Sequence, residues 1–575
     1  MEAIEARPRR RRRRWILLLL LVLGGVFWLL ARRSEPILSG TFLVVDLEKE
    51  LATRPVDGLQ QLLGGQTFDL LSLRHTLNVA AEDLRVSGLV VRVGQARLGG
   101  GMVGELRELI GRFRQSEKFV LAYANGPDTQ NYLLATAAEQ IVLDPATSLN
   151  VTGVRLISFF LKDVFARYGV QADLLRVGRF KSSFEQFALD APTAEYNEEM
   201  HSVVDSIYTT TIEKIALARG LQQEEVRHAV DRAPLSTEEA LGAKLVDSLL
   251  YRDEIEAHLK NESGQEAHLM SIETYHQSFA SAQTSPQHVA VISVIGTLVE
   301  GESREMALTG VATGDRTIER ALEQAEENDD VTGIILYIDS PGGLVTASET
   351  VWRLVDQVQK PVVACLGNRA ASGGYYVASA ADKIFAQSST LTGSIGVFGG
   401  KVVIKDLLDD HRVAPYTYAR GENAAMYDFT EPFTPEQRLR LARMMQMSYD
   451  TFLRRVSDKR SLTADAAIKA AEGRLWTGKQ ARDQSLVDAL GGLDMATEEI
   501  RQQTASPVEV ALTLRAYPPP PTAWEVLSGN GGHPLIRASL PRARLAAELH
   551  AWLVSTRLFN SPRGLALMPF TVDVR

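Results

Sequence analysis

The segment Thr390–Gly400 reads TLTGSIGVFGG, and it decides how the rest of the chain is interpreted. It places one serine, Ser394, between two glycines, directly after a short run typical of a β-strand. Small neighbours leave a serine hydroxyl room to meet the backbone of a substrate. Glycine and serine also fill ordinary turns, so this segment alone does not establish a site. Its weight comes from a second, altered copy that occurs earlier in the chain.

The composition restricts the class of protein. The 575 residues are 45% hydrophobic and 23% charged, which is ordinary for a globular chain of roughly two to four domains. The net charge of −9 argues against nucleic acid as a partner, because phosphate binding needs a basic surface. The single cysteine, Cys365, lies in an apolar run and is expected to be a buried small side chain. Scarcity of cysteine suits an oxidising compartment.

The N-terminus has the pattern of a membrane anchor. Residues 1–14 end in the unbroken basic run Arg9–Arg14, and residues 15–31 carry no charge. An apolar run of about 17 residues is at the short end of the length that spans a bilayer. A cleaved signal peptide is the alternative, but Arg32 and Arg33 follow directly and no small-residue cleavage site stands out. The pattern predicts an uncleaved anchor in the plasma (inner) membrane, with the rest of the chain on the periplasmic or extracytoplasmic side.

Two related halves follow this segment. The sequence YLLATAAEQI at Tyr132–Ile141 resembles YYVASAADKI at Tyr375–Ile384, at an offset of 243 positions. At the same offset, Val151 stands where the second half has Ser394. The pattern predicts a first repeat at 36–260, a linker at 261–287, a second repeat at 288–505 and an extension of unknown role at 506–575.

Each half alternates short apolar runs with helix-like segments. The runs at 333–338, 362–366 and 383–386 are apolar almost throughout, as parallel strands buried on both faces are. The sequence therefore predicts an α/β fold in both halves, together with the one transmembrane helix.

Glycine pairs mark two further places in the second half. Gly342-Gly343 follows a predicted strand, and Gly373-Gly374 opens a predicted helix. Backbone N–H groups at such places can hold a peptide or an oxyanion, although a tight strand-to-helix turn has the same appearance. In the first half, Gln130-Asn131 replaces Gly373-Gly374. Only the second half therefore has the pattern of a chemically competent copy.

A serine nucleophile needs a base, and a lysine is the best candidate here. No histidine lies in the glycine-rich segments, and His411 is merely the nearest in sequence. Lys181 lies in the first half, where the matching position of the second half is Ala424. The half with Ser394 thus lacks the lysine, which predicts one composite site shared by the halves or by subunits. To act as a base, Lys181 would need a pKa about 2–3 units below its usual value of about 10.4, and Ser182 is a candidate to orient the amine.

Taken together, these motifs resemble the signal peptide peptidase A family, also called protease IV, in its long tandem-repeat form. The matching motifs are DSPGG at 339–343, ASGGYY at 371–376, TGSIGV at 392–397, GRFKS at 178–182 and WTG at 476–478. The resemblance covers about residues 15–505. It implies a crotonase/ClpP-like fold in each half and a membrane-anchored homotetramer without a cofactor or metal.

The resemblance also implies roles for single residues. Ser394 would be the nucleophile, Lys181 the general base, and the amides of Gly342 and Gly343 the oxyanion donors. The substrates would be signal peptide remnants and other unfolded chains. Two alternatives remain open from the residues: an acyl-CoA enzyme of the crotonase type and a catalytically inactive scaffold.

Overall fold

The computed structural model describes residues 36–48, 51, 68–279, 287–306, 310–507, 510, 512–519 and 565–567. The predicted basic segment 1–14 and the predicted anchor 15–31 lie outside these residues. Within the described ranges, none of the helices combines the length and the apolar character that a bilayer crossing requires.

The first repeat is built on a six-stranded sheet in which every neighbouring pair is parallel. The strand order is β6-β4-β3-β2-β1-β7, and the bounds are β1 Thr41–Asp46, β2 Val86–Val93, β3 Phe119–Ala124, β4 Gln140–Leu143, β6 Ser248–Leu249 and β7 His268–Ser271. The accompanying helices are α3 Leu70–Glu82, α4 Gly100–Arg114, α5 Thr129–Ala135, α8 Ala194–Arg219, α9 Gln223–Arg232, α10 Thr237–Gly242, α11 Ile255–Ser263 and α12 Ile272–Phe279.

The second repeat has the same parallel order, β18-β8-β11-β12-β13-β17. Its strands are β8 His288–Val299, β11 Val331–Leu344, β12 Val362–Ala371, β13 Lys383–Ala386, β17 Ala489–Leu490 and β18 Thr513–Tyr517. Its helices are α13 Asp315–Glu327, α14 Val345–Gln357, α15 Gly373–Ala378, α17 Pro435–Lys459, α18 Ala464–Ala470, α19 Gly478–Asp483 and α20 Leu493–Gln503. The predicted α/β class is therefore confirmed in both halves, and helices against both faces explain the apolar strands.

Short strands complete the second sheet. β14 Leu391–Gly393 pairs in parallel with β12 and antiparallel with β16 Leu475–Thr477. β10 Gly310–Gly314 pairs in parallel with β8, and β9 Arg304–Met306 pairs antiparallel with β10. β19 Leu565–Leu567 lies antiparallel to both β11 and β15.

Two predicted boundaries differ from the structure. The segment 261–287, interpreted as a linker, instead supplies β7 and α12 to the first repeat. Likewise, the segment 506–575 begins with β18, which occupies in the second sheet the place that β7 has in the first. Both strands are short edge strands without a long apolar run, so periodicity did not reveal them.

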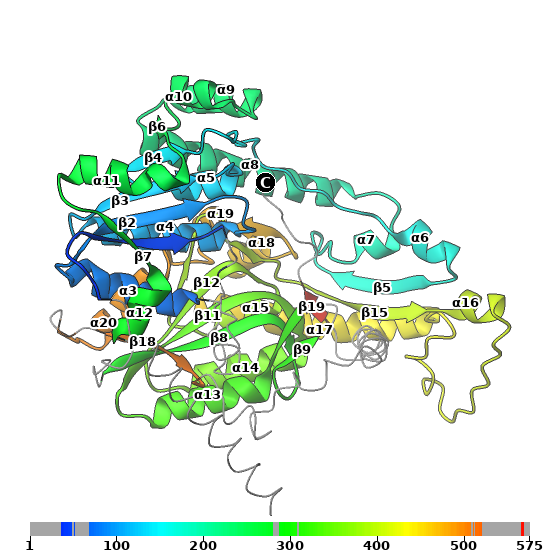
Figure 1. Ribbon diagram of the computed structural model, residues 1–575. Coiled ribbons are helices and arrows are strands. Elements are labelled where there is room, and N and C mark those ends of the chain that lie inside the picture. Colours follow the sequence, from blue (N-terminus) through cyan, green and yellow to red (C-terminus); the bar gives the residue numbers. More distant parts are fainter. Residues whose placement is uncertain are drawn as a thin grey trace, which may run out of the picture.

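An arm formed by both repeats extends to one side of the molecule (Figure 1). β5, Gln171–Val177, comes from the first repeat and pairs antiparallel with β15, Val397–Val403, from the second. The short helices α6 Lys162–Arg167, α7 Glu185–Ala188 and α16 Lys405–Asp410 accompany these strands. This pairing joins the end of β5 to the segment that follows Ser394.

One apolar cluster lies between the two sheets and contains side chains from both. Helices α3, α4 and α20 also contribute to this cluster. α4 lies directly on β12 at Gly101, where a Cβ atom would be 2.3 Å from the carbonyl oxygen of Gly367. Cys365 is fully buried in this cluster, as its apolar surroundings predicted.

Candidate active site

The strand pair β5–β15 carries Lys181 into the second repeat. Val177, the last residue of β5, is paired with Val397, and Lys181 follows four positions later. Two glycines make room for the lysine stem: a Cβ on Gly473 would be 2.4 Å from the backbone nitrogen of Lys181, and one on Gly396 would be 3.1 Å from its Cδ. The side chain of Lys181 is completely buried.

Three oxygen atoms surround the amine of Lys181. Its Nζ lies 2.6 Å from Ser372 Oγ, 3.0 Å from Ser394 Oγ and 2.9 Å from the carbonyl oxygen of Ser394. Both serines are buried. The predicted meeting of Lys181 with Ser394 thus occurs within one chain, and a second serine lies closer to the amine.

Burial sets the protonation state of this lysine. Removal from water lowers the pKa of Lys181 to about 7, and the Glu199 carboxyl opposes this shift only in part. Glu199 is itself buried, which raises its pKa to about 8. Its oxygens accept hydrogen bonds from the Leu475 N–H at 2.5 Å and from Ser182 Oγ at 3.0 Å. Near neutral pH, the amine can therefore exist in the uncharged form that accepts a proton.

Ser372 occupies a special backbone position. It directly precedes α15, with φ 55° and ψ −116°, a conformation that non-glycine residues rarely adopt. Its N–H donates to the carbonyl of Gly393 at 2.7 Å, which fixes the turn. No side chain caps the start of α15, so the first amides of this helix are not bonded to a capping side chain.

The end of β11 lies beside this turn. A Cβ on Gly373 would be 3.0 Å from the nitrogen of Gly343 and 3.2 Å from Gly342 Cα, so only a glycine fits there. Gly374 is equally tight, since its Cβ would be 2.8 Å from the carbonyl oxygen of Ser340. The two predicted glycine pairs are thus neighbours in space.

The two amides predicted as oxyanion donors differ. The N–H of Gly342 donates to Ser340 Oγ at 3.1 Å, while Ser340 Oγ donates to the carbonyl of Gly296 at 2.6 Å. Gly342 is thereby engaged in fixing the turn, at a φ of 105° that favours glycine. The geometry favours Gly343 and Gly373 over Gly342 as donors toward a group bound at Ser372.

Two further residues considered from the sequence do not hydrogen-bond the Lys181 amine. Ser182 donates to Glu199 rather than bonding the Lys181 amine, so it acts on the lysine only through this carboxyl. His411 is exposed at the end of α16, where its Nδ1 is 2.9 Å from the carbonyl oxygen of Leu407. His411 does not contribute to the site.

Sequence reasoning missed Ser372 and Glu199. Ser372 stands in the ASGGYY motif, but the glycine pair drew the interpretation toward backbone binding alone. The available signal was a serine at the position before a helix, immediately after a buried strand. Glu199 gave no local signal, because its contact with the site depends on how α8 packs against β16.

Comparison with known proteins identifies the family of this chain. The model of peptidase family S49 matches residues 112–266 and 355–506, which together are more than half of the chain, and a Clp protease model matches residues 302–392. The chain is 28% identical over 495 residues to the "Serine protease SPPA, chloroplastic" of Arabidopsis thaliana, covering 82% of this chain and 73% of the relative.

Two bacterial relatives are similar over comparable lengths. The "Protease 4" of Haemophilus influenzae is 28% identical over 511 residues, covering 82% of this chain and 80% of the relative. The "Protease 4" of Salmonella typhi is 28% identical over 529 residues, covering 88% and 82%. These matches favour a peptidase over the acyl-CoA and scaffold alternatives. The chain therefore belongs to peptidase family S49, and it is a serine peptidase with two repeated regions and a ClpP-like fold.

Proposed function

We propose that this protein is an endopeptidase in which Ser372 is the nucleophile and Lys181 the general base. The observation that carries the proposal is the separation of 2.6 Å between Lys181 Nζ and Ser372 Oγ, both on fully buried side chains. A buried, neutral amine can accept the serine proton without a histidine. This assignment replaces Ser394, which the sequence favoured as the nucleophile.

Three properties favour Ser372 over Ser394. Its hydroxyl is nearer to the amine, at 2.6 Å against 3.0 Å. It directly precedes a helix whose first amides carry no capping side chain, which favours developing negative charge. It also adjoins Gly373, which is packed against the nitrogen of Gly343. Ser394 offers the amine both its hydroxyl and its carbonyl oxygen, which suits a residue that orients the lysine.

The proposed reaction has two stages. The Ser372 hydroxyl attacks the peptide carbonyl while Lys181 takes its proton, and the amides of Gly343 and Gly373 stabilise the oxyanion. Lys181 then returns a proton to the leaving amine, which departs as the acyl-enzyme forms. Water, activated by the same amine, attacks the acyl-enzyme and releases the second product. Ser394 and Glu199 hold the lysine through this cycle as positioning residues.

We infer that an extended substrate pairs with β11 and β15 at the place that β19 occupies. β19 pairs antiparallel with β11 in the register Gly342–Leu567, Gly343–Ala566 and Leu344–Leu565, and Leu565 also pairs with Phe398 of β15. A peptide that adds a strand in this manner binds through its backbone, so it needs no fixed sequence. The pairing supports substrates that are unfolded or extended, and it makes this chain's own C-terminal segment a competitor for this place.

We infer the biological setting from the family resemblance and the N-terminal pattern. The substrates are signal peptide remnants and other peptides released from membranes. Residues 15–31 anchor the chain, Arg9–Arg14 remain cytoplasmic, and the repeats lie on the extracytoplasmic side as a homotetramer. The arginine run directly before the apolar segment supports this orientation.

Labelling with a fluorophosphonate, followed by peptide mapping, tests the nucleophile. We expect the label on Ser372 of the full-length protein, no label in Ser372→Ala, and retained though slower labelling in Ser394→Ala. A label found on Ser394 would support the second candidate and reverse the two roles. If the folded protein takes up no label and cleaves no unstructured peptide, the proposed mechanism fails.

A further inference from the structure

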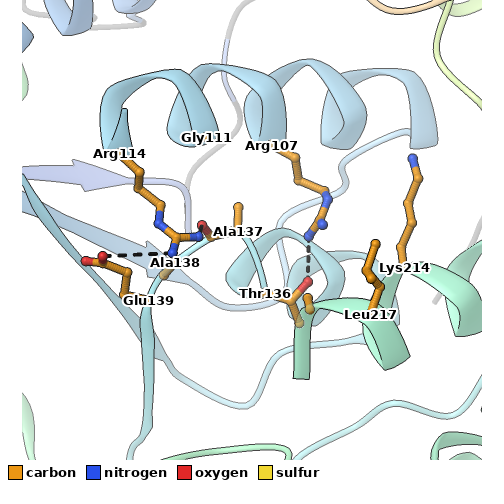
Figure 2. A pocket seen from close by; sticks show the side chains of 10 residues that line it. Arg107, Gly111, Arg114, Thr136, Ala137, Ala138, Glu139, Lys214 and Leu217 are labelled. Atoms are coloured by element: carbon orange, nitrogen blue, oxygen red, sulfur yellow. Dashed lines mark hydrogen bonds and ion pairs between the residues drawn. The ribbon is translucent and has the colours of Figure 1, made fainter. Parts of the chain in front are cut away.

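A basic hollow on the first repeat is left unexplained by the peptidase mechanism. Helices α4 and α8 and the residues after α5 enclose a cavity of about 350 Å³ (Figure 2). Three basic residues line it, namely Arg107, Arg114 and Lys214, but only one acidic residue, Glu139. None of the proposed catalytic groups lines this hollow.

Within the described part of the chain, Lys214 brings a charge into the hollow without a direct hydrogen bond or ion pair, although the Glu108 carboxylate attracts it from a longer distance. The neighbouring acids are engaged elsewhere: Glu108 accepts from Gln387 and from the Gly492 N–H, and Glu213 pairs with Lys479 at 2.9 Å. Burial lowers the pKa of Lys214 to about 8; repulsion from Arg107 adds to this shift, and attraction by Glu108 opposes it in part.

Arg107 is in a similar situation. Its guanidinium donates to two neutral acceptors, the Leu133 carbonyl oxygen and Thr136 Oγ1, and it has no carboxylate partner among the described residues. Burial lowers the pKa of Arg107 to about 10. Two half-buried cations that repel each other cost free energy unless an anion joins them.

A glycine in α4 leaves space in the hollow. Gly111 lies inside α4, where glycine destabilises a helix, and a Cβ added to it would meet no atom within 4 Å. At the rim, Leu217 is 86% exposed beside the basic groups. An empty space with cations inside and an apolar rim suits a ligand that has an anionic head and an organic body.

We propose that this hollow binds a phosphate group, either as a lipid headgroup or as a free phosphate, through Arg107, Arg114 and Lys214. A phosphate presents oxygens in several directions and can meet donors from two helices at once, whereas a carboxylate presents only two oxygens. Arg114 keeps an ion pair with Glu139 at 3.9 Å and a hydrogen bond to the Ala137 carbonyl at 3.0 Å, so Arg107 and Lys214 supply most of the attraction.

Binding to the full-length protein in a neutral detergent tests the proposal. The probes are inorganic phosphate and dihexanoylphosphatidylglycerol, measured by calorimetry against sodium chloride of equal ionic strength. We expect Lys214→Gln and Arg107→Gln each to weaken binding by about tenfold or more, as for loss of one charged hydrogen bond. Lys469→Gln, an exposed cation on α18, is the matched control and keeps wild-type binding.

Gly111→Leu fills the hollow without changing any charge, so it tests the site even where a charge variant folds poorly. We expect it to abolish binding of both probes while peptidase activity stays unchanged. Stronger binding of the lipid than of phosphate identifies a headgroup as the source, and equal binding identifies free phosphate. The proposal is overturned if the wild type binds neither probe, if the charge variants bind as tightly as the control, or if they only change the oligomeric mass, which would assign the cations to a second copy's carboxylates.

Discussion

The two repeats share a framework but differ at the start of one helix. In both, a buried tyrosine at the start of this helix donates to a distant carbonyl: Tyr132 to Leu245 at 2.6 Å, and Tyr375 to Leu486 at 2.7 Å. In both, an aspartate carboxylate accepts a backbone N–H from the equivalent strand: that of Ile141 in β4 of the first repeat and that of Ile384 in β13 of the second. The framework therefore does not determine which copy carries chemistry.

The helix start itself decides this difference. In the first repeat, Asp128 caps α5 by accepting the Asn131 N–H at 2.9 Å. In the second, Ser372 precedes α15 without making such a cap, at a positive φ. A carboxylate cap stabilises a helix and uses the amides that an oxyanion would need. The second repeat leaves those amides without a side-chain cap, as the proposed oxyanion site requires.

The largest expected effect is at the serine that marks this difference. Ser372→Ala should reduce kcat/KM for an unstructured peptide by about 10⁴-fold or more, because the nucleophile is lost. Thr129→Ala, the matched change in the first repeat, should leave activity unchanged, since the Thr129 hydroxyl only accepts the Gly153 N–H. Activity loss in the Thr129 variant of equal size would show that the first repeat also carries chemistry.

The second-largest expected effect is at Lys181, and it is compared with a change at Ala424, the equivalent position of the second repeat. Lys181→Met should also reduce kcat/KM by about 10⁴-fold, whereas Ala424→Lys, at the exposed matching position, should have no effect. In the wild type, the amine must be neutral to act. Its pKa of about 7 predicts a plateau above that pH and a decline of about tenfold per pH unit below it. A decline that begins near pH 10 would exclude a buried base.

The same shift affects stability. Between pH 8 and 10 the unfolded chain holds the Lys181 proton that the folded chain has released, so stability rises with pH. Titration of Glu199 changes the stability with pH in the opposite direction, but its raised pKa of about 8 confines this contribution to lower pH. The unfolding free energy of the wild type should therefore gain about 1.4 kcal/mol per pH unit on that of Lys181→Met. Urea titrations at pH 8, 9 and 10 measure this slope, and parallel curves would contradict it.

Ser394→Ala should have an intermediate effect. Losing one of the three oxygens around the amine should lower kcat/KM by about 10- to 100-fold, through misplacement of the lysine. The carbonyl of Ser394 still holds the amine at 2.9 Å in this variant. Retained fluorophosphonate labelling distinguishes such a positioning role from that of the nucleophile. A loss as large as that of Ser372→Ala would exchange the two serines in the mechanism.

The sequence predicted the framework better than the site. The offset between halves and the apolar strands were visible because buried parallel strands need continuous apolar runs. The convergence of Lys181 with Ser394 followed from their complementary absence in the other copy. Ser372 was missed because its contact with Lys181 arises only when β5 pairs with β15, two segments more than 200 residues apart, and because its positive φ belongs to the turn between β12 and α15. No periodicity in either segment reports such a pairing.

A smaller effect concerns β19, which has no counterpart in the first repeat among the described residues. Ending the chain after residue 519 preserves β18 but removes the strand that pairs with Gly342 and Gly343. If this strand stays paired most of the time, kcat/KM for short peptides should rise by about three- to tenfold. A synthetic peptide spanning 562–570 should inhibit the shortened chain. Unchanged activity together with no inhibition would separate β19 from the place where the substrate binds.

The smallest effect returns to the helix start in the first repeat. Asp128→Ala removes the side-chain acceptor from the Asn131 N–H and should lower the free energy of unfolding by about 1 kcal/mol, as for other lost caps. Activity should stay within about twofold of the wild type, because a single lost helix cap does not displace Lys181. Urea unfolding and peptide hydrolysis measured on the same preparation give both values. A loss of activity beyond tenfold at near-normal stability would mean that the capped helix acts on the reaction, and the division between a structural and a chemical copy would not hold.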